Sequence, residues 1–262
     1  MPLVRPRSHQ LIAALIAAFA AAFSLCTYAA DDAGITPYRP SVSSPAQLPV
    51  PGQLELELGI LSSKMDDTKR DSLPYQFKLA FNPQWGVLIG GESYVSARDE
   101  FGNRERGLGD TTLVLKRAFL VDDKTAFGLE LGIKSPTAKD SIGSGKTDYS
   151  LNGIFSKDID WLHMDANLNF TRLGTSEPDT SRTQTGWSAS FSLPVADKWG
   201  TTAELSGTHR MGAPNTAQLL AALTYSPSNR LTIDCGVAKG LTKASQDWSL
   251  FTGIVLPIAK FW

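Results

Sequence analysis

Apolar and polar residues alternate with a period of two in one segment after another from residue 53 onward. Leu54, Leu56, Leu58 and Ile60 alternate with polar residues or glycine, and the stretch 127–134 repeats the pattern. Successive side chains of a β-strand point to opposite faces, so this pattern predicts strands with one apolar and one polar face. The chain is therefore predicted to be all-β.

About twelve segments carry this alternation. The expected strands are 53–62, 73–82, 85–96, 109–120, 125–135, 147–156, 161–173, 185–195, 199–209, 216–226, 231–240 and 247–258. Strands of about ten residues span the apolar layer of a membrane when they are tilted. An even number of them returns both chain ends to the same side.

The links between these strands alternate in length. Short links occupy 82–84, 121–124, 157–160, 196–198 and 227–230. Longer links, rich in Gly, Ser, Thr and charge, are expected at Ser63–Ser72, Arg98–Leu108, Pro136–Lys146 and Gly174–Gln184. Membrane barrels have tight periplasmic turns and long outer loops. A soluble β-sandwich is the alternative fold, and it gives no reason for links to alternate in this way.

Tryptophan is placed at strand ends. Trp85, Trp161 and Trp199 follow short links and Trp262 ends the chain on that side, whereas Trp187 and Trp248 lie at opposite strand ends. Indole rings favour the boundary between lipid and water, so all of these are predicted membrane-interface aromatics. Trp161 fits least well because its parity matches the polar face of its strand.

The C-terminal strand is apolar on one parity from Trp248 to Ile258, and Trp262 shares that parity. A last strand that ends on an aromatic residue resembles the signature of outer-membrane proteins read by the barrel assembly machinery. Lys260 interrupts the pattern and Pro257 departs from it, although proline is tolerated near a strand end. The assembly machinery and outer-membrane lipid are the expected partners.

The N-terminus reads as a secretory signal peptide over residues 1–30. Arg5 and Arg7 precede the apolar run Leu11–Leu25, and cleavage is expected after Ala29 or Ala30. The run is short for a membrane anchor helix, which is the alternative. Export and the alternating strands together predict the outer membrane of a Gram-negative bacterium.

Residues 31–52 form a proline-rich lead that carries no strand pattern. This lead could thread into the barrel as a plug, or it could hang in the periplasm as a linker, which is the commoner role of such segments. The expected organisation is a signal peptide, then this lead, then an antiparallel transmembrane β-barrel over residues 53–262. Closure is expected because unpaired backbone groups are costly in hydrocarbon.

Composition excludes several classes. The formal net charge of −1 gives no basic surface for nucleic acid. Cys235 is the only cysteine after the signal peptide, so neither an internal disulfide nor a cysteine metal site is expected. Nothing in the pattern points to a cofactor.

Polar positions of the strands are expected to face the lumen. The predicted lumen-lining residues on a transport path are Glu55, Glu57, Lys78, Glu92, Asp110, Lys116, Glu130, Lys134, Asp148, Asp165, Asn167, Glu204 and Asp234. Acids outnumber bases here, which favours cations or neutral polar solutes in a wet lumen. The alternative is a packed interior closed by ion pairs, with Glu130, Lys116 and Asp110 as one candidate network.

Catalysis is not expected. Barrel lipases use serine with histidine, but the mature chain has only His163 and His209, and neither stands in a recognisable serine motif. The loop Ser141–Lys146 contains glycines at the wrong spacing for a phosphate loop, and a strand follows it. No catalytic residue is assigned.

Three short motifs resemble one outer-membrane family. Gly107–Asp110 with Lys116 is similar to the "GLGD…K" strand of the family named for the meta-pathway of phenol degradation, and Gly132–Thr137 with Gly143–Asp148 is similar to its next hairpin. Ser135 departs slightly from that pattern. The resemblance implies an outer-membrane channel associated with uptake of aromatic compounds, and it supplies no catalytic motif.

The expected function is passive or facilitated passage of small molecules, with aromatic compounds as one class. The alternative is a non-conducting barrel that is structural or binds a partner through its outer loops. A lipid-modifying barrel enzyme is a further, less favoured reading.

Overall fold

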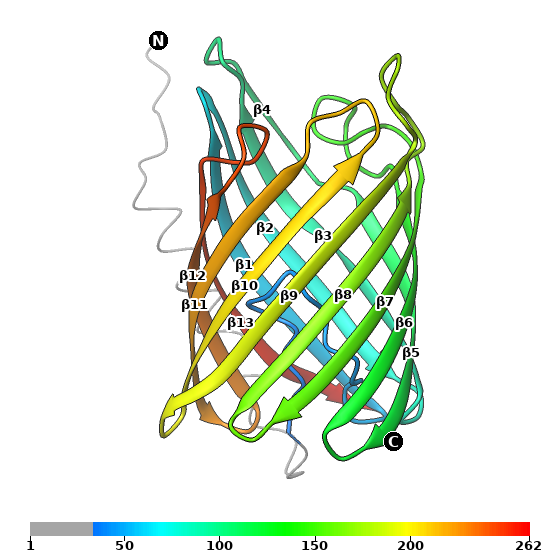
Figure 1. Ribbon diagram of the computed structural model, residues 1–262, viewed down its shortest axis with the longest axis vertical. Helices are drawn as coiled ribbons and strands as arrows, with labels where there is room; N and C mark the ends of the chain where they lie inside the picture. Colours follow the sequence, from blue (N-terminus) through cyan, green and yellow to red (C-terminus); the bar gives the residue numbers. More distant parts are fainter. Residues whose placement is uncertain (1–33) are drawn as a thin grey trace, which may run out of the picture.

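The computed structural model describes residues 34–262 as one β-barrel (Figure 1). The predicted signal peptide, residues 1–30, and its cleavage site lie outside the described residues. The strands are β1 (Gln53–Met65), β2 (Thr68–Ala80), β3 (Trp85–Arg98), β4 (Arg104–Gly107), β5 (Thr111–Asp122), β6 (Thr125–Ser135), β7 (Asp148–Ile159), β8 (Leu162–Arg172), β9 (Thr183–Ala196), β10 (Trp199–Arg210), β11 (Thr216–Ser228), β12 (Leu231–Gly240) and β13 (Trp248–Lys260).

The sheet closes on itself through antiparallel neighbours. β1 pairs with both β2 and β13, and β2 also pairs with β3, so the described sheet has no free edge between its first and last strands. β4 and β5 pair in succession with the same strand, β3, and together make one interrupted barrel strand. The predicted closed antiparallel barrel of twelve strands is thus confirmed.

The barrel wall is apolar outside and polar inside. In β6, Phe127, Leu129, Leu131 and Ile133 are exposed, whereas Glu130 between them is buried. This is the reverse of a soluble core and matches the alternation of a membrane barrel, with lipid outside and a polar interior. Within residues 34–262, no helix is long and apolar enough to cross a membrane.

One predicted outer loop is wrong. The sequence predicted a long link over Ser63–Ser72, but β1 and β2 continue through most of that range and are joined at Asp66–Asp67, where Asp66 has a φ of 50°. The predicted link Arg98–Leu108 likewise contains β4. Ladder hydrogen bonds use the backbone, so strands extend beyond the apolar layer whatever their side chains are. The polar residues in these strand extensions lack the apolar–polar alternation, and the sequence pattern therefore predicted a loop there.

The two edges of the barrel differ. We call the edge with the C-terminus and the short turns after β2, β5, β7, β9 and β11 the inner edge, and the opposite edge the outer edge. The longest outer connections are 136–147 and 173–182. Both ends of the described strand region, Gln53 and Lys260, pair at the inner edge.

The lipid-facing position of Leu131 predicts a depth-dependent cost for charge. Leu131→Lys, at the middle of β6, is expected to lower the free energy of unfolding by about 2–4 kcal/mol because the ammonium would lie in hydrocarbon. Val121→Lys, which is also exposed but lies near the inner edge, is the matched control and should cost about 0–1 kcal/mol. Urea titration in lipid vesicles measures both values. Equal costs would contradict a membrane-spanning orientation.

Candidate functional site

Residues 34–52, which we call the inserted segment, lie inside the barrel in the half nearer the inner edge (Figure 1). The segment enters where the Ile35 N–H donates to the Asn229 carbonyl in the β11–β12 turn, and it leaves where the Gly52 N–H donates to the Ala80 carbonyl. Between these points Tyr38 and Ala46 are buried. The described part of the proline-rich lead, residues 34–52, therefore lies in the lumen and does not hang outside it as a linker.

Wall carboxylates hold the backbone of the inserted segment. The Thr36 N–H donates to both Glu55 oxygens at 3.2 Å, and the Tyr38 N–H donates to Glu57 Oε1 at 2.8 Å. A segment with five prolines, at 37, 40, 45, 49 and 51, and no strand of its own leaves its N–H groups without partners unless the wall supplies them. Glu55 and Glu57 occupy inward-facing positions of β1, so their carboxylates can accept hydrogen bonds from these N–H groups.

Two wall lysines enclose the ring of Tyr38. Lys78 Nζ lies 4.3 Å from the ring centroid and Lys116 Nζ lies 4.1 Å from it, which are cation–π distances. Lys78 also contacts Glu55 at 3.1 Å and Glu57 at 2.6 Å, and both lysine side chains are fully buried. Lys116 pairs with Glu130 at 3.0 Å. The inserted segment thus completes a charged network that belongs to the wall.

Arg39 reaches across the lumen to β12. Its Nε and Nη2 donate to the two carboxylate oxygens of Asp234, each at 2.9 Å, in a bidentate pair. The guanidinium passes beside Gly59 and Gly253, where an added Cβ would lie 2.7 Å and 2.3 Å from it. Small residues on β1 and β13 therefore make room for this side chain.

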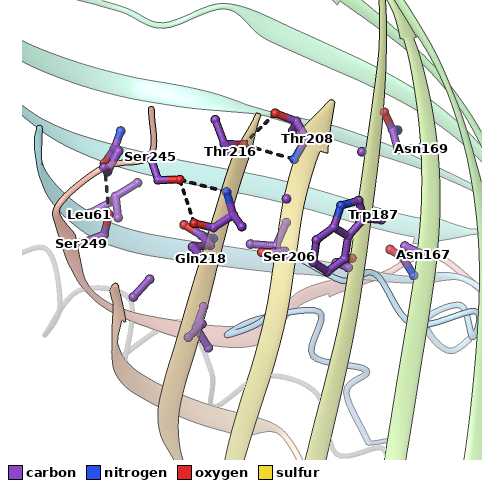
Figure 2. Close-up of a pocket in the computed structure, with 18 of the residues that line it drawn as sticks. Leu61, Asn167, Asn169, Trp187, Ser206, Thr208, Thr216, Gln218, Ser245 and Ser249 are labelled. Carbon is purple, nitrogen blue, oxygen red and sulfur yellow. Dashed lines mark hydrogen bonds between the residues drawn. The ribbon is translucent and has the colours of Figure 1, made fainter. Parts of the chain in front are cut away.

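A cavity of about 830 Å³ lies between the inserted segment and the outer edge (Figure 2). Arg39, Pro40 and Val42 form its floor. Its wall on β8–β11 carries uncharged hydrogen-bonding side chains, namely Asn167, Asn169, Gln184, Ser188, Ser206, Thr208, Thr216 and Gln218. Leu61, Met65, Leu220 and Phe251 add apolar surface. Because Arg39 is paired with Asp234, no unpaired charged side chain lines this cavity.

The predicted lumen-lining residues fall into three groups in the structure. Those at the inserted segment or its network are Glu55, Glu57, Lys78, Lys116, Glu130, Asn167, Glu204 and Asp234. Asp110, Lys134, Asp148 and Glu92 lie nearer the outer edge, Glu92 pairing with Arg70. Asp165 lies at the inner half, where it accepts from Ser156 and contacts His163.

The proposed interaction of Glu130, Lys116 and Asp110 as one network is only partly present. Glu130 and Lys116 form an ion pair, but Asp110 pairs with Lys134 instead. Neighbouring strands place Lys116 opposite Glu130, and Asp110 lies beyond the start of β5, too far along the strand. Sequence reasoning also missed Tyr38 and Arg39, because side chains on an irregular segment have no parity to reveal them.

The aromatic residues predicted for the membrane interface lie near the barrel edges. Trp161, Trp199 and Trp262 are exposed near the inner edge, where Trp199 stacks on Tyr225 with centroids 4.7 Å apart. The Arg117 guanidinium lies 4.9 Å from the Trp85 ring. Trp187 packs over Gly207, where an added Cβ would lie 2.9 Å from the indole, and Trp248 begins β13.

The two histidines of residues 34–262 contact no serine hydroxyl within that range. His163 contacts Asp158 at 2.6 Å and Asp165 at 3.1 Å, and His209 Nδ1 lies 2.7 Å from Asn215. Within residues 34–262, no group of three His, Cys, Asp or Glu side chains is placed to hold a metal ion. Cys235 is free and exposed.

Comparison with known proteins places this chain. A family model described as "Putative MetA-pathway of phenol degradation" matches residues 39–258. The chain belongs to this family. The match begins at Arg39, so it includes much of the inserted segment as well as the barrel.

Solved structures share the fold of this family member. It resembles the COG4313 outer membrane channel from Pseudomonas putida F1 with a TM-score of 0.66 and 12% identity, over 81% of this chain and 97% of that chain. The NanC porin gives 0.54 and 10% over 78% and 98%, and the KdgM porin gives 0.53 and 10% over 77% and 98%. These likenesses show the fold, a closed antiparallel β-barrel. A search of curated proteins gives no match.

The motifs that resemble the phenol meta-pathway family meet at the outer edge. Lys134 Nζ lies 2.9 Å from Asp110 Oδ2 and 2.9 Å from Asp148 Oδ2. Asp110 also accepts from the Ala138 N–H in the 136–147 loop, and Asp148 accepts from the Gly174 N–H in the 173–182 loop. We call Asp110, Lys134 and Asp148 the rim clamp, because they join both long outer loops to the wall.

Asp110 of the rim clamp is ionised at neutral pH. Burial alone would raise the pKa of the Asp110 carboxyl, but hydrogen bonds from Lys134 and from the Ala138 N–H bring that pKa below its usual value. Asp110 therefore stays ionised and attracts the Lys134 ammonium. Gly143 packs against this carboxylate, since an added Cβ would lie 2.7 Å from Asp110 Oδ1.

Lys78 is predicted to be essential for stability. Lys78→Met leaves Glu55 and Glu57 buried without a cation, and the free energy of unfolding should fall by about 3–5 kcal/mol. Lys69→Met is the matched control, because the pair between Lys69 and Asp71 is exposed and contributes little. Unfolding in detergent followed by gel mobility measures both variants. A Lys78→Met barrel as stable as Lys69→Met would contradict the network.

Loss of the rim clamp is predicted to loosen the 136–147 loop without unfolding the barrel. Lys134→Met removes the cation shared by Asp110 and Asp148, and trypsin should then cut more rapidly at Lys139 and Lys146. Lys124→Met, in the inner turn between β5 and β6, is the control and should leave the cleavage rate unchanged. Unchanged cleavage in Lys134→Met would show that the loop is held by other contacts.

Proposed function

We propose that this chain is an outer-membrane channel for passive or facilitated uptake of small uncharged molecules. The observation that carries the proposal is the cavity of about 830 Å³, which is lined by amides and hydroxyls and adjoins an apolar surface. That volume lies in the range of sites that hold a small organic ligand. Membership of the phenol meta-pathway family and a fold like that of the COG4313 channel support it.

Charge pairing favours neutral solutes over cations. Most of the acids expected to line a transport path are partnered inside the barrel: Glu55 and Glu57 by Lys78, Glu130 by Lys116, and Asp234 by Arg39. Glu204 is the exception, with no cation beside it among the described residues. Paired charges leave little field to attract an ion into the outer cavity. Compounds with a hydroxyl group on an apolar frame match the mixed lining, and hydroxylated aromatic compounds are one such class.

One observation favours the alternative of a non-conducting barrel. The inserted segment fills the inner half of the lumen and is held by buried ion pairs and hydrogen bonds. Such a barrel could serve through its outer loops alone. The channel and the non-conducting barrel differ in one respect, which is whether a continuous passage through the lumen opens when the inserted segment is displaced. We propose no catalytic role, since neither histidine contacts a serine and the similar solved structures are named as channels and porins.

Deletion of residues 34–51 tests the channel directly. The deletion is expected to give frequent single-channel steps in planar bilayers and faster swelling of liposomes in a neutral polyol, because the obstruction is gone. The full chain should show fewer or smaller steps. Heat-modifiable gel mobility confirms that the deleted protein still forms a barrel. A folded deletion variant that passes neither ions nor polyol would contradict the channel.

A further inference from the structure

A second cavity lies at the inner edge against the same part of the wall as the outer one. It measures about 410 Å³, and its lining includes Ser192, Thr202, Thr224 and Ser226. The outer cavity is lined higher on the same strands by Asn167, Ser188, Ser206 and Gln218. Both cavities therefore lie along β8–β11. Hydroxyl and amide groups on this wall are accompanied by charged ones: Asp165 and Glu204 lie between the cavities, and Asp158, His163 and Lys198 line the inner one.

A single row of residues separates the two cavities on this wall. Asp165 on β8, Ser190 on β9 and Glu204 on β10 are neighbours in register, and each lies between residues of its own strand that line the outer and the inner cavity. On β9 the outer cavity ends at Ser188 and the inner begins at Ser192, so Ser190 is the only inward position between them. The barrier along this wall is therefore short.

The tip of the inserted segment, residues 41–44, closes the path across this short barrier. The next residue, Pro45, is held by Lys116, whose Nζ donates to the Pro45 carbonyl. The Ser43 N–H donates to Glu204 Oε2 at 2.8 Å, and the Ser44 N–H donates to Asn167 Oδ1 at 2.7 Å. Asn167 Nδ2 donates back to the Ser44 carbonyl at 2.9 Å. No ion pair holds the tip to β8–β11 among the described residues.

The rest of the inserted segment is held much more firmly, by other strands. Tyr38 is enclosed by Lys78 on β2 and Lys116 on β5, Arg39 pairs with Asp234 on β12, and the Ala46 N–H donates to Ser156 on β7. Tyr38 and Arg39 are therefore held by buried cations and by an ion pair. The contacts that close the path along β8–β11 are hydrogen bonds alone, with no ion pair and no cation–π contact.

Glu204 makes the closed state costly. Its side chain is buried, yet one N–H is its only hydrogen-bond donor, and its Oε1 has no hydrogen-bond partner. No cation pairs with it among residues 34–262. A buried carboxylate without a counter-charge is destabilising, so moving the tip and admitting water to Glu204 relieves a cost of the closed state.

We propose that solute crosses between the two cavities along β8–β11, and that the gate is a local displacement of the tip from Glu204 and Asn167 while Tyr38, Arg39 and Ala46 stay in place. This proposal rests on the channel function proposed above. The gate then consists of the contacts of the tip with two wall residues. Solute passes beside the inserted segment, most of which stays in the lumen.

Proline substitution tests the gate contact. Ser43→Pro removes the N–H that binds Glu204, and the ratio of open to closed time in planar bilayers should rise about two- to tenfold, as expected for one lost hydrogen bond. Ser41→Pro is the matched control, because the Ser41 N–H makes no hydrogen bond to the wall in the described chain. On the wall side, Glu204→Gln keeps an acceptor for the Ser43 N–H and removes the uncompensated charge, so the ratio of open to closed time should fall.

A disulfide distinguishes local displacement from departure of the whole segment. An ideal Cβ on Gly128 would lie 3.1 Å from Ala46 Cα, so Ala46→Cys with Gly128→Cys, in a Cys235→Ser background, can pin the segment to β6. Combined with Ser43→Pro, the oxidised protein should conduct as much as the reduced protein. Closure on oxidation that dithiothreitol reverses would overturn the local gate.

The deletion variant separates this result from failure of the channel itself. If the 34–51 deletion conducts but the pinned Ser43→Pro protein closes, the channel stands and the local gate is wrong. If Ser43→Pro and Ser41→Pro open equally, the contact with Glu204 does not control opening and the proposal also fails. If the folded deletion variant does not conduct, the proposed function itself is wrong.

Discussion

Every part of this structure depends on backbone hydrogen bonding around a closed sheet. In hydrocarbon an unpaired N–H or C=O group costs several kcal/mol, so the only sheet that can cross is one whose first and last strands pair. Here β1 pairs with β13, and β2 pairs with β3. Closure then forces alternate side chains into an interior that lipid cannot reach, and the polar residues of every strand collect there.

A polar interior creates the next requirement, which the inserted segment meets. Buried carboxylates and ammonium groups are tolerated only with partners. The wall pairs some of them within itself, as Lys116 does with Glu130, and offers others to the N–H groups of residues 36–46. Arg39 in turn supplies the cation for Asp234. Barrel and segment are thus electrostatic complements, and the outer cavity is lined mainly by neutral groups.

Sequence pattern predicted the strands because alternation reports directly on the two environments of a barrel wall. It failed where that contrast ends: the polar turn at Asp66–Asp67 read as a long loop, although its strands continue above the membrane. For the proline-rich lead the sequence favoured a periplasmic linker over a plug in the lumen, because a stretch without alternation gives no sign of the surface it contacts. The family motifs could be recognised in the sequence, but the sequence could not show that Asp110, Lys134 and Asp148 of these motifs meet as the rim clamp.

The sequence by itself determined the all-β class, the strand count and which residues of each strand share a face, since these follow from local periodicity. Only the tertiary structure decided register, and with it which charges meet: Lys116 lies opposite Glu130, while Asp110 is left to Lys134. It alone brought Tyr38 between two lysines and Ser43 onto Glu204. Such contacts join residues far apart in the chain, and pattern along a chain cannot specify distances across a lumen.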